Sequence, residues 1–561
     1  MRLQVRAHDL AARINVFETA HGKVETPTVL PVINPNKILI PPSQMNVDAV
    51  ITNAYILWKQ HYDDVTARGV HDFLSFNKTI MTDSGAYQLM EYGDIDVSNE
   101  EIIAFQQAIA VDIGTVLDIP TASKDYATIK QNVHKTLERL REGAKLFRKN
   151  ILRVAPIQGS VFPRLVKESS TKASSLDYDI HALGSMVPLL KDYHYDKVID
   201  AIAAARANMP SDRLLHLFGA GHPVFFSFAA AIGVDLFDSA SYALYARDNR
   251  YITEMGTSNL KEMKHLPCSC SVCRGNTVSD ILNHPQKEKL LAEHNLNVIL
   301  EEIERIKEAI NEGTLWELLE VRARAHPSLL KAFKRVLKYT KLLESQDPIV
   351  KKHIFILSPY SRKQPAVKRA IRRIKKVKGK KMDFPPYGKV PIKVLDCFPF
   401  NQTVSEHEIK LKKSDDDYEK LKAISEYWFG CNVFSKNVKI RRSKLTKRMR
   451  SVHKGDKTLA SFDASSYLLY LHEAALTLHD KTKRKKAFRV VVDNSVREFA
   501  SSGRNVFAKF VKACDPEIVP GQVVLVVDEE DNLLCSGEAK MSAKEMLDFN
   551  FGVAVKPRWH P

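Results

Sequence analysis

The stretch Thr79-Ile80-Met81-Thr82-Asp83-Ser84-Gly85 shows the pattern that decides the fold: a short apolar, β-branched run that ends in a polar, glycine-bearing cluster. Further runs of this kind lie on both sides of it, separated by segments long enough for helices. The eight runs are 28–33, 49–53, 79–82, 115–117, 153–157, 180–183, 214–217 and 234–237. Apolar strands that alternate with helical segments favour a parallel sheet covered on its outer face, and eight units favour a closed (β/α)8 TIM barrel. An open doubly wound sheet is the alternative, but we find no GxGxxG phosphate turn.

Polar residues follow five of these runs, at the point where each expected strand ends. They are Asp83-Ser84-Gly85, Asp118, Gln158-Gly159, Gly184-Ser185 and Asp238-Ser239. In a barrel of this kind the carboxyl ends of all strands meet on the face that carries the chemistry. We therefore expect Asp83 and Asp238, far apart in the sequence, to share one pocket.

Two strand-end aspartates suit a double displacement at the anomeric carbon of a sugar. One carboxylate attacks C1′, and the other manages the proton of the departing and the entering base, with net retention of configuration. Aspartates also cap helices at strand-to-helix turns, and that role explains any single one of them equally well. The surrounding sequence has to decide between these interpretations.

Three cysteines cluster in the way that metal thiolates do: Cys268, Cys270 and Cys273. Seven cysteines in 561 residues do not suggest a disulfide framework, so a reducing cytoplasm is expected. A structural zinc site needs four tetrahedral donors, and one is missing locally. His294, on an expected helix, is the favoured fourth ligand, with His265 and His284 as competitors. We expect one structural zinc ion per chain.

Charge divides the chain into two parts. Residues 1–340 carry 39 Lys and Arg against 40 Asp and Glu, a net charge near −1, whereas residues 341–561 carry 45 against 26, near +19. This asymmetry favours a polyanion-binding appendage on a separate working domain, with a solvated basic surface as the alternative. No apolar stretch approaches the length that crosses a bilayer, so we expect no membrane association.

Composition and turn signals predict four domains. They are a catalytic barrel over 1–344 with its zinc site near 268–294, a basic linker or α+β domain over 345–414, a second basic α+β domain over 415–487 and a β-rich domain over 488–561. Residues 290–337 are expected to be helical. In the last domain, residues 497–511 are expected to form a short helix interrupted at Gly503.

Four motifs carry a family resemblance. Successive signatures of the tRNA-guanine transglycosylase family are similar to Thr82-Asp83-Ser84-Gly85-Ala86-Tyr87-Gln88, Leu117-Asp118-Ile119-Pro120-Thr121, Pro156-Ile157-Gln158-Gly159 and Leu236-Phe237-Asp238-Ser239-Ala240. The cysteine cluster and His294 follow in the family's order, and the similarity covers at least residues 1–300. Chance does not produce several ordered motifs of this length.

The resemblance implies roles for the strand-end residues. Asp238 would be the nucleophile that forms a glycosyl-enzyme intermediate, and Asp83 the general acid/base, although the two roles could be reversed. Asp118 and Gln158 would hydrogen-bond the edge of a guanine or deazaguanine ring. Backbone groups around Gly184 and Ser185 would contact the rest of the base. A buried aspartate that faces the donors of a purine discriminates sharply, because a base without those donors leaves the carboxylate unpaired.

Two features resemble the archaeal branch of the family. The bacterial pattern has DSGGFQ at the first motif and GGL near Gly184, where this chain differs, and residues 488–561 resemble a PUA domain, a small RNA-binding β-barrel that bacterial relatives lack. The resemblance implies an archaeosine-type transferase that exchanges guanine at position 15 of the tRNA D-loop for 7-cyano-7-deazaguanine (preQ0). It also implies a homodimer.

Two other functions stay open. An archaeosine synthase paralogue shares the architecture and the PUA tail but acts on the inserted base. It is disfavoured because this chain has Asp83, Asp238 and a full set of zinc-ligand candidates. A non-catalytic tRNA-binding protein would use only the basic tail, and it would exchange no base.

Overall fold

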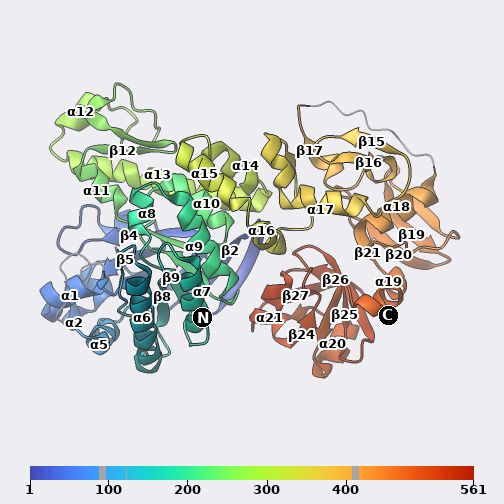
Figure 1. Ribbon diagram of the computed structural model, residues 1–561, viewed down its shortest axis with the longest axis horizontal. Helices are drawn as coiled ribbons and strands as arrows, with labels where there is room; N and C mark the ends of the chain where they lie inside the picture. Colours follow the sequence, from blue (N-terminus) through green and yellow to red (C-terminus); the bar gives the residue numbers. More distant parts are fainter. Residues whose placement is uncertain (87–96, 122, 407–415) are drawn as a thin grey trace. The chain divides into compact units, whose positions relative to one another are not determined.

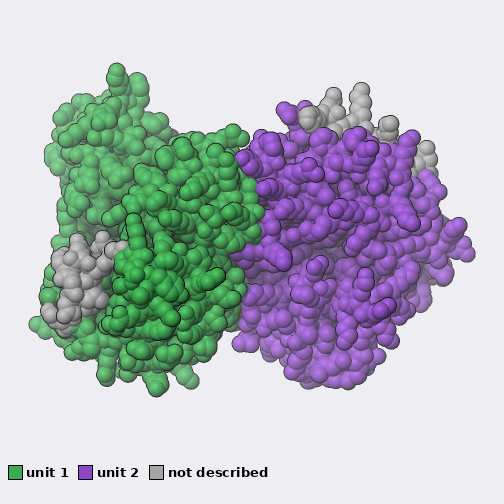
Figure 2. All heavy atoms as spheres, viewed as in Figure 1, with its two compact units in different colours: residues 1–7, 12–310, 318–339 green, residues 8–11, 311–317, 340–561 purple. Residues whose placement is uncertain are grey.

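The computed structural model describes residues 1–86, 97–121, 123–406 and 416–561 (Figure 1). The chain forms two compact units, drawn in different colours in Figure 2. Unit 1 comprises Met1–Ala7, Ala12–Ile310 and Leu318–Tyr339, and unit 2 comprises His8–Ala11, Asn311–Glu317 and Thr340–Pro561. Tyr87 and Gln88 of the first motif, and the domain boundary expected near 415, lie outside the described residues.

Unit 1 is built on a closed barrel of eight parallel strands, as the run pattern predicts. The strands are β4 (Thr28–Ile33), β5 (Ala49–Asn53), β6 (Thr79–Asp83), β7 (Ile113–Thr115), β8 (Leu152–Ile157), β9 (Ile180–Leu183), β10 (Leu214–Leu217) and β11 (Leu236–Ser239). They pair in chain order, and β11 returns to pair with β4. An open doubly wound sheet is thereby excluded for this part of the chain.

Two strands are displaced from their predicted positions by two residues. β7 ends at Thr115, because the amide of Leu117 donates to the side-chain oxygen of Asn99 at 3.2 Å instead of to the backbone of a neighbouring strand. β11 begins at Leu236, because the amide of Val234 still bonds to the carbonyl of Ala229 at 3.1 Å, in the preceding turn. The exact ends of these strands depend on hydrogen bonds to side chains and turns, which the positions of apolar residues in the sequence do not predict.

Helices surround the barrel, as Figure 1 shows for α6, α7 and α9. The helices between the strands include α1 (Ala54–Gln60), α2 (Tyr62–Arg68), α3 (Val70–Phe73), α5 (Asn99–Ala108), α6 (Tyr126–Leu146), α7 (Pro163–Ser174), α8 (Val187–Lys191), α9 (Tyr195–Ala207) and α10 (Phe226–Ala231). Only a 3₁₀ turn (Pro42–Gln44) lies between β4 and β5, so the first β/α repeat of the barrel lacks the regular helix of the (β/α)8 pattern. The segment 290–337, expected to be helical, is covered by α13 (Lys287–Glu312), which begins three residues earlier, α14 (Leu315–Arg322) and α15 (Pro327–Val336).

An N-terminal antiparallel sheet precedes the barrel and was not anticipated from the sequence. It consists of β1 (Leu3–Asp9), β2 (Ala12–Thr19) and β3 (Gly22–Thr26). The hydroxyl of Thr19, at the end of β2, hydrogen-bonds the hydroxyl of Thr79 at 2.8 Å. Because Thr79 is the first residue of β6, the β2–β3 turn lies at the amino end of the barrel strands.

The larger part of unit 2 contains several small sheets and the C-terminal β-rich segment. Residues 340–487 include α16 (Thr340–Gln346), α17 (Pro365–Ile374), α18 (Asp417–Phe429), α19 (Ala474–Thr482) and a four-stranded sheet of β18 (Lys439–Arg442), β19 (Met449–Lys454), β20 (Lys457–Phe462) and β21 (Leu469–Leu471). A single hydrophobic core runs from this part into the last segment, where Val519, Val523 and Leu525 contribute to it.

The last segment forms a six-stranded sheet with the order β23-β27-β26-β25-β22-β24. Its strands are β22 (Arg489–Val492), β23 (Val506–Phe507), β24 (Val511–Cys514), β25 (Val523–Val527), β26 (Leu533–Ala539) and β27 (Val553–Trp559). The helix expected over 497–511 is wrong in its second half. The α-helix α20 covers only Arg497–Ser501, and a single 3₁₀ turn follows at Ala508–Phe510. Gly503 turns the chain at φ 76°, and both Val506–Phe507 and Val511–Cys514 pair into the sheet.

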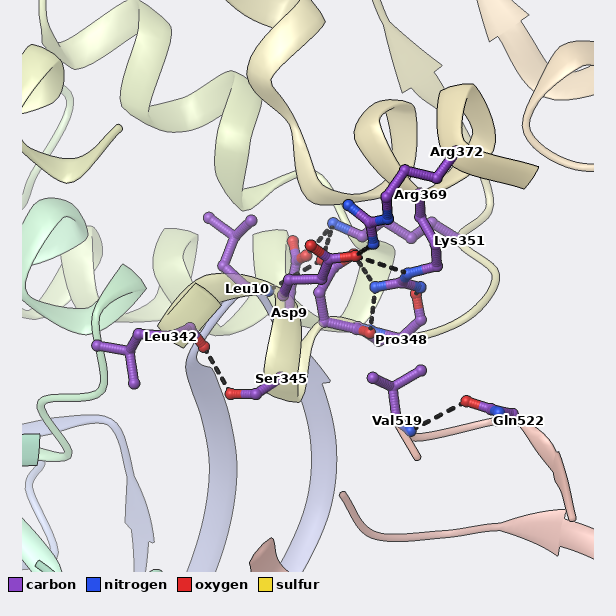
Figure 3. Close-up of polar contacts among 12 residues, drawn as sticks. Asp9, Leu10, Leu342, Ser345, Pro348, Lys351, Arg369, Arg372, Val519 and Gln522 are labelled. Carbon is purple, nitrogen blue, oxygen red and sulfur yellow. Dashed lines mark hydrogen bonds and ion pairs between the residues drawn. The ribbon is translucent and has the colours of Figure 1, made fainter. Parts of the chain in front are cut away.

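Unit 2 contains a buried network of charges that joins three distant segments (Figure 3). The ammonium of Lys351 lies between the carboxylates of Asp9 and Asp347, 2.6 Å from the latter. Arg369 bonds to the same Asp347 at 3.2 Å. Burial raises the pKa of Asp9 to about 6, although the charge of Lys351 opposes this effect. The network holds His8–Ala11 in unit 2.

Among the described residues, no helix has the length and apolar character that a membrane span needs.

Candidate active site and metal centre

Asp83 lies at the end of β6, directly before Ser84 and Gly85. The side-chain amide of Asn53, at the end of the neighbouring β5, donates to its carboxylate at 3.1 and 3.3 Å. Gly85 has φ 86°, and a Cβ there would lie 2.2 Å from Cβ of Tyr55, so the turn requires glycine. The turn therefore fixes the position of the Asp83 carboxyl group.

The surroundings of Asp83 favour its protonated form. Desolvation by the surrounding protein, together with the negative charges of Asp238 and Asp118, raises the pKa of Asp83 to about 7, against hydrogen bonds from Gly85 and Asn53 that lower it. The three strand-end aspartates are thus close enough to interact electrically. A carboxyl with a pKa near neutrality can both donate and accept a proton at physiological pH.

Asp238, on β11, has a different environment. Its carboxylate accepts hydrogen bonds from Nε2 of His216 at 3.0 Å and from the amide of Gly219 at 2.9 Å. The Asp238 side chain is 13% exposed, whereas that of His216 is fully buried. Two donors to one carboxylate hold Asp238 in a single orientation at the end of β11.

His216 was not singled out from the sequence. It lies on β10, and because a carboxylate only accepts hydrogen bonds, its Nε2 must carry the hydrogen that faces Asp238. Its Nδ1 is buried without a hydrogen-bond partner among the described residues. The available signal was one polar residue inside the apolar run Leu214–Leu217, on the strand beside that of Asp238.

Asp118, Gln158 and Ser185 form a connected polar row. The side-chain amide of Gln158 donates to the Asp118 carboxylate. Its carbonyl oxygen accepts from the hydroxyl of Ser185 at 2.6 Å, and that hydroxyl accepts from the amide of Thr121 at 3.1 Å. Both Asp118 and Gln158 are buried. These bonds fix the orientation of the Gln158 amide, with its nitrogen toward Asp118 and its oxygen toward Ser185.

Two backbone positions support this row. A Cβ at Gly184 would lie 2.7 Å from the side-chain nitrogen of Gln158, so glycine allows the amide to pack against the backbone. Ser185 has φ 60°, in the left-handed region. The structure thus brings Asp118, Gln158, Gly184 and Ser185 together at the ends of successive strands, as the barrel hypothesis predicts.

Burial raises the pKa of Asp118 to about 6, against hydrogen bonds from Gln158 and Ser84 and the positive charge of Arg139. The Arg139 guanidinium donates to the backbone carbonyls of Leu117 and Asp118 at 3.2 and 3.3 Å. Asp118 is therefore a buried acceptor held next to a cation. Such a group suits the N–H edge of a heterocyclic base.

The cysteine cluster and His294 form one group of potential metal ligands. The ligand atoms of Cys268, Cys270, Cys273 and His294 all lie within 4.8 Å of one another. Nδ1 of His294 lies 3.5 Å from Sγ of Cys270 and 3.4 Å from Sγ of Cys273. A tetrahedral zinc ion separates nitrogen and sulfur ligands by about 3.6 Å, so this donor set fits zinc. Neither His265 nor His284 belongs to the group.

The surroundings of His294 orient it for this task. It is buried on α13, its ring stacks on Tyr251 at 3.7 Å, and its Nε2 donates to the backbone carbonyl of Ile252 at 2.9 Å. This bond fixes the tautomer and directs the free Nδ1 at the thiols, which is the usual arrangement around a metal-binding histidine.

Three family models match this chain. Residues 9–328 match the model described as queuine tRNA-ribosyltransferase, residues 419–485 match the patch-forming domain C2 of tRNA-guanine transglycosylase, and residues 488–560 match the PUA domain.

Proteins named tRNA-guanine(15) transglycosylase are similar to this chain over its length. The protein of Pyrococcus furiosus is 42% identical over 577 residues, which cover 100% of this chain and 98% of the relative. That of Pyrococcus abyssi is 43% identical over 579 residues, with the same coverage. That of Methanocaldococcus jannaschii is 36% identical over 648 residues, covering 100% of this chain and 99% of the relative.

Proposed function

Because this chain belongs to the archaeal tRNA-guanine(15) transglycosylase family, a group of pentosyltransferases, we propose that it replaces guanine 15 of tRNA by preQ0 through a covalent aspartyl–ribose intermediate. The observation that carries this proposal is the pairing of two unlike carboxyl groups at strand ends of one barrel. Asp83 has a pKa near neutrality, and Asp238 accepts two hydrogen bonds. This pairing suits a step that needs an acid and a nucleophile together.

In the first half-reaction, the Asp238 carboxylate attacks C1′ of the target nucleotide. The glycosidic bond breaks, its electron pair stays on guanine, and Asp83 supplies the proton that the departing base takes up. In the second half, Asp83 accepts the proton of the incoming base, which attacks C1′ and releases Asp238. The reversed assignment is disfavoured, because Asp83 with its raised pKa is the better proton carrier.

The polar row would recognise the base. The Asp118 carboxylate would accept from the N–H groups of guanine or preQ0, and Gln158, held by Ser185, would bond the same edge. Backbone groups at Gly184 and Ser185 would lie along the rest of the ring. An exchange needs one pocket that accepts both bases, and the pyrimidine edge of the ring is common to guanine and preQ0.

Cys268, Cys270, Cys273 and His294 would hold one zinc ion. With four protein donors the ion has no open position, so it would stabilise the segment between β13 (Gly256–Asn259) and α13 and take no part in the chemistry.

We propose that tRNA is held chiefly by residues 341–561, where 45 Lys and Arg stand against 26 Asp and Glu. The division into domains 1–344, 345–414, 415–487 and 488–561, with the last acting as a PUA module, belongs to this proposal. So does a homodimeric assembly in the cytoplasm.

The test is base exchange into an unmodified tRNA transcript that carries guanine 15. Labelled guanine and labelled preQ0 are offered to the wild type and to Asp238→Asn, and a denaturing gel is searched for a covalent tRNA complex. We expect exchange and a covalent band in the wild type, and neither in the variant. A wild type that binds tRNA without exchange would instead support the paralogue or the binding protein. Exchange of guanine alone would exclude preQ0 as the incoming base.

A further inference from the structure

A second cluster of potential ligands lies at the opposite end of the barrel from the strand-end aspartates. It consists of His21, in the turn between β2 and β3, His71 on α3, and Asp112, which directly precedes β7. The amide of Ile80 in β6 donates to Oδ2 of Asp112 at 2.9 Å. Since Asp112 and Ile80 are at the amino ends of their strands, the cluster is separate from the carboxyl-end site.

The three side chains converge closely. Nδ1 of His21 lies 2.8 Å from Oδ1 of Asp112, and Nε2 of His71 lies 3.2 Å from Oδ2. The two imidazole rings stack with centroids 3.6 Å apart. One ligand atom from each residue can be chosen so that all lie within 4.8 Å of one another. Nitrogen and oxygen ligands of a tetrahedral zinc ion are about 3.3 Å apart, so small shifts accommodate an ion.

The tautomer of His71 indicates what belongs between these groups. Nδ1 of His71 lies 3.0 Å from the backbone carbonyl of Phe76, which only accepts, so Nδ1 carries the hydrogen. In the neutral ring Nε2 then presents its lone pair to the carboxylate. Nε2 is buried and makes no hydrogen bond among the described residues, although Oδ2 of Asp112 lies 3.2 Å away. A lone pair facing a carboxylate is repulsive unless a proton or a metal ion lies between them, and because the Nε2–Oδ2 contact lacks hydrogen-bond geometry, the metal ion is favoured.

We propose that His21, His71 and Asp112 bind a second divalent transition-metal ion, zinc being the one that this donor set suits best. The backbone bond of His71 repeats the arrangement at His294, where the nitrogen that does not face the cluster also donates to a main-chain carbonyl. The His21 side chain is 37% exposed, so water completes the coordination.

The ion connects three segments that are distant in the sequence. The β2–β3 turn, α3 and the start of β7 are brought together at residues 21, 71 and 112, and the Thr19–Thr79 bond holds the same turn against β6. The ion therefore stabilises the amino end of the barrel. It has no part in base exchange.

Metal content of the full-length protein tests the proposal. The wild type, supplied with zinc and freed of loosely bound metal by gel filtration, should contain two zinc ions per chain. His21→Ala, a change at a partly exposed turn position, should contain one and should unfold at a lower temperature. His134→Ala is the matched control, because His134 is an exposed histidine outside both clusters. One zinc ion in the wild type would overturn the proposal.

Cobalt(II) separates the two sites by their donors. The Cys3His group gives thiolate-to-cobalt charge-transfer absorption, and the His2Asp group gives only ligand-field bands. We expect His21→Ala to lose the ligand-field bands of the His2Asp group and to keep the charge-transfer absorption of the Cys3His group. We expect Cys270→Ser to lose the charge-transfer absorption and to keep the bands of the His2Asp group. Asp112→Asn checks the result with a change that preserves size. A second metal equivalent that survives both His21→Ala and Asp112→Asn would place the ion elsewhere and overturn the proposal.

Discussion

At the scale of single residues, the protonation of Asp83 links stability to pH. Its pKa is about 7 in the folded protein and close to 3.8 in the unfolded chain. Between these values the unfolded chain binds fewer protons, so this group lowers stability as pH rises from about 4 to 7, and the full penalty persists above 7. Asp83→Asn removes the penalty. We expect the Tm of this variant to match the wild type near pH 4 and to exceed it at pH 8.

Asp118→Asn provides the comparison for that experiment. The pKa of Asp118 is raised to about 6, so its stabilising effect should level off about one pH unit lower. Calorimetry across pH 4 to 9 measures both profiles. A variant no more stable than the wild type at pH 8 would contradict the raised pKa of the aspartate that it replaces. Asp83→Asn should also lose base exchange by about 10²- to 10⁴-fold, the usual contribution of a general acid/base.

His216 is expected to position Asp238. A hydrogen bond to a charged group contributes about 1.5–3 kcal/mol. His216→Leu, which preserves an apolar strand position, should therefore slow formation of the covalent tRNA complex by about 10- to 100-fold. Affinity for tRNA should not change. His216→Gln, which can still donate, should recover part of the rate.

His181→Leu is a suitable control for His216→Leu. His181 lies on the adjacent β9 and is also fully buried, but it pairs in register with Leu215 and so points to the other side of the sheet. Its substitution should leave the rate unchanged. Equal losses in both variants would indicate general damage to the barrel, and His216 would have no positioning role.

At the scale of elements, zinc should hold the segment around Cys268–Cys273 only while all four ligands are present. Cys270→Ser should reduce bound zinc at this site and lower Tm together, because metal binding and local folding are coupled. Cys431→Ser, a half-buried cysteine outside the cluster, should change neither. Undiminished zinc in Cys270→Ser, measured by mass spectrometry, would show that the ligand set is wrong.

The elements also show what the sequence could predict. Eight apolar runs predict the barrel because each strand is buried on both faces, and strand ends then place Asp83 and Asp238 on one side without any knowledge of distances. His216 could not be found in this way, since its role depends on which strand lies beside β11. The N-terminal sheet was missed as well, because β1 and β2 mix charged residues such as Arg6 and Arg13 with their apolar ones. The bend after Gly503 was missed because Val506–Phe507 is too short to show a strand pattern.

At the scale of the whole molecule, the charge network in Figure 3 holds unit 2 together across the sequence. Lys351→Met would leave Asp9 and Asp347 buried and facing each other without their shared cation. Breaking a buried pair in this way costs about 3–5 kcal/mol. We expect a large loss of thermal stability, partly reversed by adding Asp9→Asn. A variant as stable as the wild type would show that the network contributes little.

The proposal that residues 341–561 bind tRNA is better tested by substitutions that remove charge than by deletion of the last segment. Removing 488–561 would strip Val519, Val523 and Leu525 from a core that also contains Leu421 and Tyr427, so the remaining part would be damaged. The sequence suggested a self-contained last domain. It could not reveal the shared core, because that core depends on contacts between distant segments, which no local sequence pattern shows.

Two exposed cations of β18, Lys439 and Arg441, offer the cleaner experiment. Each phosphate contact changes the slope of log affinity against log salt by about 0.9. If both residues contact tRNA, Lys439→Gln with Arg441→Gln should weaken binding and reduce the slope by nearly two, with the rate of exchange at saturating tRNA unchanged. Lys130→Gln with Lys135→Gln on α6 is the matched control. An unchanged slope in the β18 variant would move the tRNA contacts away from this strand, and a reduced slope in the α6 control would extend them to the barrel.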